Sequence, residues 1–161
     1  MKRLFYLIVA AGMVAGMSSC GSKQPVAETA GFGTYETECL GNDVDCQQML
    51  RVYGTGLNED DAIEQALKKA VSDVTFTGIQ GGGGECNGYP VVDQANAREK
   101  YDTYFNQFFK KGGTYKKFVT LKRQQKKSAK SYQGAGTVTM EVIVKVDRPG
   151  LKKRFQKDKI I

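Results

Sequence analysis

The strongest constraint on the fold is a stretch near the C-terminus in which apolar and polar side chains alternate. Residues 137–147 are Thr-Val-Thr-Met-Glu-Val-Ile-Val-Lys-Val-Asp. Side chains in a strand repeat every two residues, so the alternate apolar ones share one face. That face carries Val138, Met140, Val142, Val144 and Val146. The pattern therefore predicts a half-buried β-strand.

A second strand is predicted upstream, from Tyr115 to about Arg123. The residues that follow it, 124–130, are polar and basic and suit a turn region. Strands joined in this way pair antiparallel, because a hairpin needs no crossover helix. We therefore expect a basic β-hairpin.

A strand and a helix are predicted earlier in the chain. Residues 48–53 alternate loosely and end in Gly54-Thr55-Gly56, which we interpret as a turn. Asn58 and the three acids after it predict a helix N-terminus. Two apolar stripes follow at helical spacing, namely Ile63, Leu67, Ala70 and Val74 and, beside them, Ala62, Ala66 and Ala70. Gly78 ends this helix, and Gly81–Gly84 is predicted to be a loop too permissive to hold one conformation unaided.

Two further helices complete the prediction. One spans Gln94–Lys111 and carries an aromatic face that we expect in the core, although such a face could instead dock a sugar or a peptide. The other begins at Asp147-Arg148-Pro149, with Leu151 and Phe155 on its apolar edge. The order β-α-α-β-β-α predicts an α+β fold, in which helices pack on one face of a small antiparallel sheet. The aromatic face comprises Tyr101, Tyr104, Phe105, Phe108 and Phe109.

The N-terminus has the pattern of an export signal. Lys2 and Arg3 precede an apolar run from Leu4 to Val14, followed by small residues as far as Ser19. The run is shorter than the roughly 20 residues that a membrane-spanning helix needs. We predict a signal peptide over 1–19, a tether of small and polar residues over 20–34 and a single domain over 35–161.

The residues Met17-Ser18-Ser19-Cys20 resemble the lipobox of bacterial lipoproteins, except that leucine is usual where Met17 stands. The resemblance implies that Cys20 becomes the lipidated N-terminus of the mature chain. The alternative is an ordinary signal peptide that leaves Cys20 as a plain thiol.

Three cysteines remain as disulfide candidates, Cys39, Cys46 and Cys86. The residues between Cys39 and Cys46 are mostly polar and can turn back, so a local disulfide is one option. Three pairings exist in principle, and the sequence does not choose among them. In a reducing compartment all three thiols would be free.

Charge divides the mature chain into two halves. Residues 20–109 contain 6 Lys and Arg against 14 Asp and Glu, a net charge of −8. Residues 110–161 contain 16 against 3, a net charge of +13. The basic half could attract an anionic partner, or it could face the acidic half across the fold. The candidate contact residues are Lys116, Lys117, Lys122, Arg123, Lys126 and Lys127.

The chain contains no histidine, which excludes Ser-His-Asp and Cys-His catalysis and HExxH zinc sites. Gly54-Thr55-Gly56 lacks the remaining residues of a phosphate-binding loop. Asp43 and Asp45 do not follow EF-hand spacing. We expect no cofactor and no metal, and export argues against a nucleic-acid partner.

Two family resemblances accompany these patterns. Val52 to Gly56, with alanines at four-residue intervals and Val74, is similar to the opening strand and Ala-rich helix of the LPP20-like lipoproteins. The runs 96–101 and 104–109 resemble a family of uncharacterised lipoproteins of Bacteroides-type bacteria. These resemblances imply location and fold, and they bring no catalytic residues.

The sequence as a whole predicts a non-enzymatic lipoprotein of the cell envelope, anchored by lipid to the outer membrane on its periplasmic or surface face. Its partner would be an envelope protein or another anionic envelope component. The alternative is a small envelope enzyme that uses carboxylate, Tyr or Lys groups.

Overall fold

The computed structural model describes residues 35–127 and 136–161, and the side chain of Lys127 is not described. The predicted signal peptide, Cys20 and the tether fall on residues 1–34 and so lie outside the described residues. Of the predicted turn region 124–130, residues 124–127 instead belong to a strand, and residues 128–130 lie outside the described residues.

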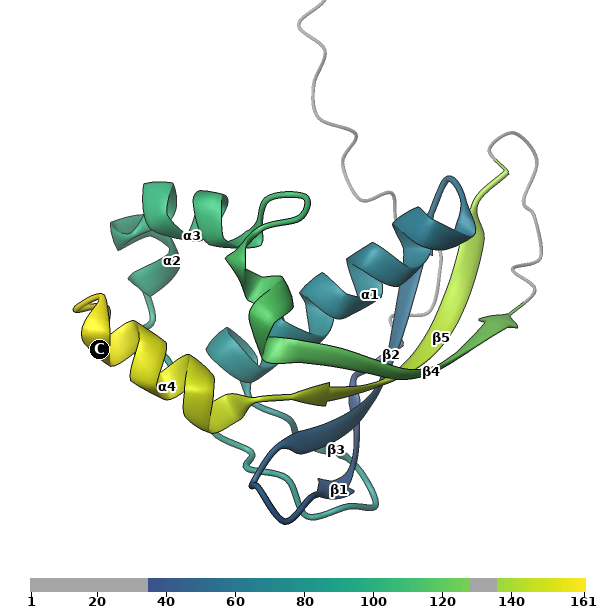
Figure 1. The fold of residues 1–161 in the computed structure, drawn as a ribbon. Coiled ribbons are helices and arrows are strands. Elements are labelled where there is room, and N and C mark those ends of the chain that lie inside the picture. The colour runs from purple at the N-terminus through teal and green to yellow at the C-terminus, as the bar shows by residue number, and fades with distance from the viewer. Residues whose placement is uncertain (1–34, 128–135) are drawn as a thin grey trace, which may run out of the picture. The chain divides into compact units, whose positions relative to one another are not determined.

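Five strands form one sheet, in the order β3-β1-β2-β5-β4 (Figure 1). All pairings are antiparallel except that of β1 with β3, which is parallel. The α+β class is confirmed. The sheet is mixed rather than antiparallel throughout, because β1 and the short β3, two strands that the sequence did not predict, pair parallel. The strands are β1 (Glu38–Asn42), β2 (Gln48–Gly56), β3 (Gly81–Gly82), β4 (Val119–Lys127) and β5 (Val138–Val146).

The predicted alternating strand is β5, which lies between β2 and β4 in the sheet. Val142, Val144 and Val146 are fully buried, and Met140 is nearly so. The hairpin of β4 with β5 is also confirmed. Its first strand begins at Val119, later than predicted, because Thr114–Phe118 instead form a 3₁₀ helix (η2) that buries Tyr115 completely.

Helix α1 (Glu59–Ser72) packs across β2 and β5 and continues as a π-helical turn (η1, Asp73–Thr77). The side chain of Asn58 caps it by accepting a hydrogen bond from the Asp61 amide, at 2.9 Å. The buried stripe is Ala62, Ala66 and Ala70, whereas Ile63 and Leu67 are only half-buried.

The Gly54-Thr55-Gly56 segment is not a turn but the end of strand β2, lying directly beneath α1. A Cβ on Gly54 would sit 2.1 Å from the Ala62 carbonyl oxygen, and one on Gly56 would sit 2.5 Å from the Ala62 nitrogen. Strand glycines and helix alanines therefore allow an unusually close approach of α1 to the sheet.

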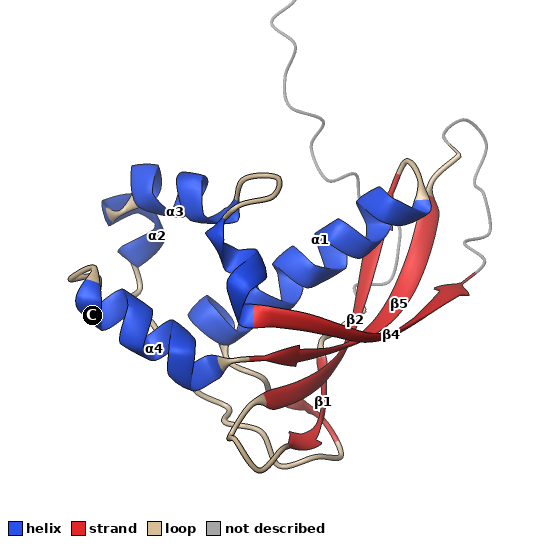
Figure 2. Cartoon of the chain, viewed as in Figure 1, coloured by secondary structure: helices blue, strands red, loops and turns tan. Residues whose placement is uncertain are grey.

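The predicted helix over 94–111 is interrupted at Tyr101, giving α2 (Ala97–Lys100) and α3 (Asp102–Phe109). The last helix is α4 (Arg148–Lys157), which begins where predicted. The Asp147 side chain caps it by accepting a hydrogen bond from the Gly150 amide. Figure 2 shows the helices together on one side of the strands, as expected.

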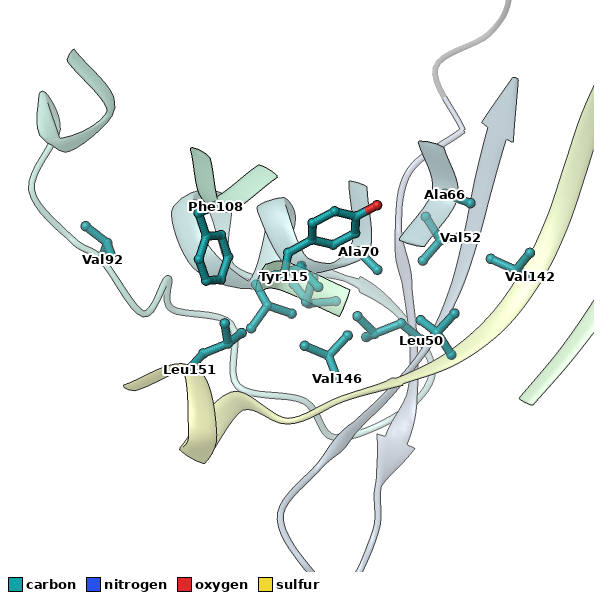
Figure 3. Close-up of a cluster of buried hydrophobic side chains, with 14 of the residues drawn as sticks. Leu50, Val52, Ala66, Ala70, Val92, Phe108, Tyr115, Val142, Val146 and Leu151 are labelled. Atoms are coloured by element: carbon teal, nitrogen blue, oxygen red, sulfur yellow. The ribbon is translucent and has the colours of Figure 1, made fainter. Parts of the chain in front are cut away.

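The core lies between this helical layer and the sheet (Figure 3). Leu50 and Val52 of β2 contact the helices together with the β5 valines. The aromatic face belongs to this core, because Phe105 and Phe108 are buried and the Phe108 ring lies 5.5 Å from that of Phe155. Leu151 and Phe155 of α4 are fully buried, as predicted.

The glycine run holds one conformation because it packs closely against β1. Gly81–Gly82 are β3 itself. Gly82 has a φ of +103°, and a Cβ there would lie 2.4 Å from the Cys39 nitrogen. A Cβ on Gly84 would lie 2.3 Å from the Gly41 nitrogen. Gly81 and Gly82 therefore form a strand rather than part of the predicted loop, and the backbone of β1 supplies a constraint that the run lacks unaided.

Candidate functional site

The disulfide joins Cys39 of β1 to Cys86, which follows β3, with 5.8 Å between their Cα atoms. The local Cys39–Cys46 pairing is wrong, because Cys39 is buried in β1 while Cys46 lies exposed in the β1–β2 turn. The Cys46 thiol is free. The disulfide thus joins β1 to the segment after β3, at one edge of the sheet.

The candidate basic surface is carried by η2 and by β4, which forms the opposite edge of the sheet. Lys116 and Lys117 lie in η2, whereas Lys122, Arg123 and Lys126 lie along β4. Every residue from 120 to 126 is exposed. Lys127 ends the strand. We call residues 119–127 the basic edge strand.

Part of the basic set faces the acidic half of the chain, as the alternative interpretation proposed. Lys116 Nζ lies 3.0 Å from Glu64 Oε2, and Lys126 Nζ lies 2.9 Å from Glu59 Oε1. Both carboxylates belong to α1. These two lysines therefore join η2 and β4 to the helix beside them.

Three other members of the set have no ion-pair partner among the described residues. Within the residues that the structure describes, Lys117, Lys122 and Arg123 form no ion pair. All three are exposed. Their charges are consequently available to a partner, and the sequence did not separate them from the paired lysines.

Glu64 is the most connected carboxylate near this surface. It accepts hydrogen bonds from the Gly112 amide (3.0 Å), the Tyr115 hydroxyl (3.1 Å) and Lys116 (3.0 Å). Burial by itself raises the pKa of Glu64, but these three donors outweigh it and lower the pKa below its ordinary value. Glu64 therefore stays ionised, and it links α1 to η2, the segment that precedes the basic edge strand.

Tyr104, Tyr115 and Glu64 form side-chain hydrogen bonds with residues distant in the sequence. Burial, helped by the hydrogen bond to Asp158, raises the pKa of Tyr104 to about 12. Burial and the Glu64 charge raise the pKa of Tyr115 as well. Both tyrosines are thus neutral at neutral pH. Glu64, with its lowered pKa, lacks the raised value that a general acid requires.

The sheet face away from the helices carries a cross-strand network of charged and aromatic groups. Arg51 Nη1 lies 2.7 Å from Glu38 Oε2, and Tyr53 donates a hydrogen bond of 3.1 Å to Glu141. The ring of Tyr35 stacks on that of Tyr53 with 4.4 Å between centroids. These contacts tie β1, β2 and β5 together across their surface.

Two surface depressions lie elsewhere. One, of about 280 Å³, lies between the N-terminal half of α1 and Lys111, and the other, of about 320 Å³, lies over α2 and α3. Neither is lined by the basic edge strand. In the described part of the chain, no cluster of three or more His, Cys, Asp or Glu could hold a metal ion.

No helix among the described residues is both long and apolar enough to cross a bilayer. In comparisons with known proteins, the chain matches no protein family, no curated protein and no solved structure.

Proposed function

We propose that this protein is a non-enzymatic lipoprotein of the cell envelope that binds another envelope protein through its basic edge strand. The observation that carries the proposal is the set of exposed cations on β4 and η2 that have no ion pair among the described residues, Lys117, Lys122 and Arg123. Fixed charge of one sign raises the local concentration of partners of the opposite sign and speeds their encounter.

The location follows from the sequence of the N-terminus. A short apolar run after two basic residues, followed by Met17-Ser18-Ser19-Cys20, supports export and lipid attachment at Cys20. Each buried methylene contributes about 0.8 kcal/mol to membrane binding, so several acyl chains on one residue anchor a protein firmly. The domain would then meet its partner at the outer membrane.

The proposal is tested by crosslinking in a native-like bacterial host. A photo-crosslinking residue at exposed Thr120 of the full-length protein should form one reproducible adduct with an envelope protein. The double variant Lys122→Glu/Arg123→Glu should lose that adduct, because it reverses the unpaired charges.

The matched control is Lys152→Glu/Lys153→Glu, which changes the net charge equally at two exposed positions of α4. It should keep the adduct. If the β4 variant keeps the adduct, or if both variants lose it equally, contact through the basic edge strand is wrong.

A further inference from the structure

We infer that the basic edge strand binds its partner by strand addition, in which an extended, acidic segment of the partner pairs with the backbone of β4. This inference rests on the proposed function and specifies the chemistry of the partner. It is carried by the position of β4 in the sheet, its length and exposure, and its charge.

Strand β4 is long and lies at the edge of the sheet. β4 is the last strand of the sheet, and among the described residues it pairs only with β5. An edge strand presents unpaired amide and carbonyl groups that can template another strand. The opposite edge strand, β3, has only two residues, whereas β4 has nine. The sheet therefore has one edge long enough for strand addition.

The usable part of this edge is defined by a bulge. The pairing passes from Leu121↔Val144 directly to Arg123↔Ile143, so Lys122 is the extra residue. From Arg123 to Lys127 the register with β5 then runs without interruption. Five residues in regular register span about 16 Å, enough for several backbone hydrogen bonds.

Charge argues against a second copy of this chain as the occupant. Pairing two β4 strands would bring their Lys122, Arg123 and Lys126 side chains close together, and like charges across a strand pair are destabilising. Lysines on an edge strand are a known barrier to self-association. An acidic strand converts the same charges into favourable cross-strand pairs.

The side chains of β4 also describe the partner sequence. Arg123 and Gln125 lie on the sheet face away from the helices, opposite Ile143 and Glu141, while Gln124 and Lys126 lie on the helix face. No apolar side chain occurs between Arg123 and Lys127. The segment that fits is therefore polar, with carboxylates that reach the basic residues.

The test uses the full-length protein in a non-ionic detergent and a labelled heptapeptide in which Glu alternates with Thr. A second peptide has the same side chains but a methyl group on every backbone nitrogen, which keeps the charge and removes the amide donors. We expect the first peptide to bind and to slow hydrogen exchange at the amides of residues 123–127. The affinity of the methylated peptide should be lower by a factor of about ten or more, because backbone pairing is lost.

Charge is tested by exchange of sign. The variant Lys122→Glu/Arg123→Glu should no longer bind the acidic peptide and should instead bind a matched peptide in which Lys replaces Glu. An unfolded variant would not show this new binding. Equal binding of the methylated and unmethylated acidic peptides overturns strand addition. So does protection of β4 by phosphatidylglycerol vesicles but not by the peptide, which would indicate a lipid surface instead.

The two proposals fail in different ways. If strand addition alone is wrong, the in-cell adduct from residue 120 still depends on Lys122 and Arg123, while the peptides give no protection of β4. If the proposed function is wrong, that adduct is absent or does not depend on these charges.

Discussion

At the scale of single residues, one carboxylate and two glycines hold α1 in place. The Glu64 carboxylate joins α1 to the segment 112–116 through three donors. Gly54 and Gly56 remove the side chains that would keep α1 away from β2. Each position makes a contribution that a conservative substitution can isolate.

Glu64→Gln should destabilise the domain by about 1–3 kcal/mol at pH 7, because three donors, among them the hydroxyl of buried Tyr115, lose a charged acceptor. The pKa of Glu64 in the folded state lies below its ordinary value of 4.5. Its stabilising effect is therefore complete above pH 4.5 and is lost as the pH falls through the folded-state pKa. Urea unfolding at several pH values should show the wild-type advantage shrinking in acid.

The control for this prediction is Glu99→Gln, the same chemical change on an exposed carboxylate that makes no hydrogen bond within the described residues. It should leave the free energy of unfolding at pH 7 within about 0.5 kcal/mol of wild type. An advantage of Glu64 that does not depend on pH would contradict the assignment.

Gly54→Ala should destabilise the domain by about 2 kcal/mol or more, since the new methyl group meets the α1 backbone rather than a movable side chain. Gly83→Ala is the matched control, because nothing lies within 4 Å of a Cβ at that position. It should change stability by about 0.5 kcal/mol or less. Thermal unfolding of the two variants side by side decides the point, and equal stabilities would show that α1 can move away.

At the scale of elements, the two edges of the sheet differ in length, composition and exposure. The β3 edge is short, rich in glycine and covalently attached to β1 through Cys39 and Cys86. The β4 edge is long, exposed and protected by charge and a bulge. The disulfide fixes the segment after the short β3 edge to β1, whereas the β4 edge offers a long row of backbone groups for pairing.

Cys39 and Cys86 are 47 residues apart in sequence, and a cross-link closing a loop of that length stabilises the fold by about 4 kcal/mol in the chain-entropy view. Cys39→Ala/Cys86→Ala should therefore unfold at clearly lower urea concentration. Cys46→Ser should unfold like wild type, because its thiol is exposed and free. Peptide mapping without reductant should recover the Cys39–Cys86 pair and an alkylated Cys46; a Cys39–Cys46 peptide would refute this pairing.

At the scale of the whole molecule, the acidic and basic halves of the chain meet along α1. Ion pairs from Lys111, Lys116 and Lys126 to acids of α1 neutralise part of the basic half. The remaining positive charge on β4 and η2 faces outward. Some cations of the basic half therefore stabilise contacts with α1, and others are exposed to a partner.

Lipid attachment is the prediction that concerns the complete chain. In a native-like host the mature protein should begin at Cys20, carry a diacyl or triacyl mass on that residue and sediment with the outer membrane. Cys20→Ala should abolish both the lipid mass and the membrane association. An unlipidated N-terminus in the wild-type protein would remove the anchor from the proposed function and favour the alternative of a soluble envelope enzyme.

Local signals in the sequence determined several elements of this protein. Strand β5 follows from its alternation, the start of α1 from the Asn58 cap, and α4 from Asp147 and Pro149. Each depends on neighbours within a few residues, so the chain encodes it directly. The buried aromatic face of 101–109 was predictable for the same reason, although its interruption at Tyr101 was not.

Only the tertiary structure decided the elements whose stability comes from distant partners. β1 exists because it pairs with β2, and β3 exists because it pairs with β1. Cys39 meets Cys86 only after that pairing. Likewise, Lys116 and Lys126 differ from Lys122 and Arg123 only because α1 places Glu64 and Glu59 beside the first two. Contacts between residues far apart in sequence leave no periodicity to detect, which is why the sequence identified the basic residues but not which of them are available.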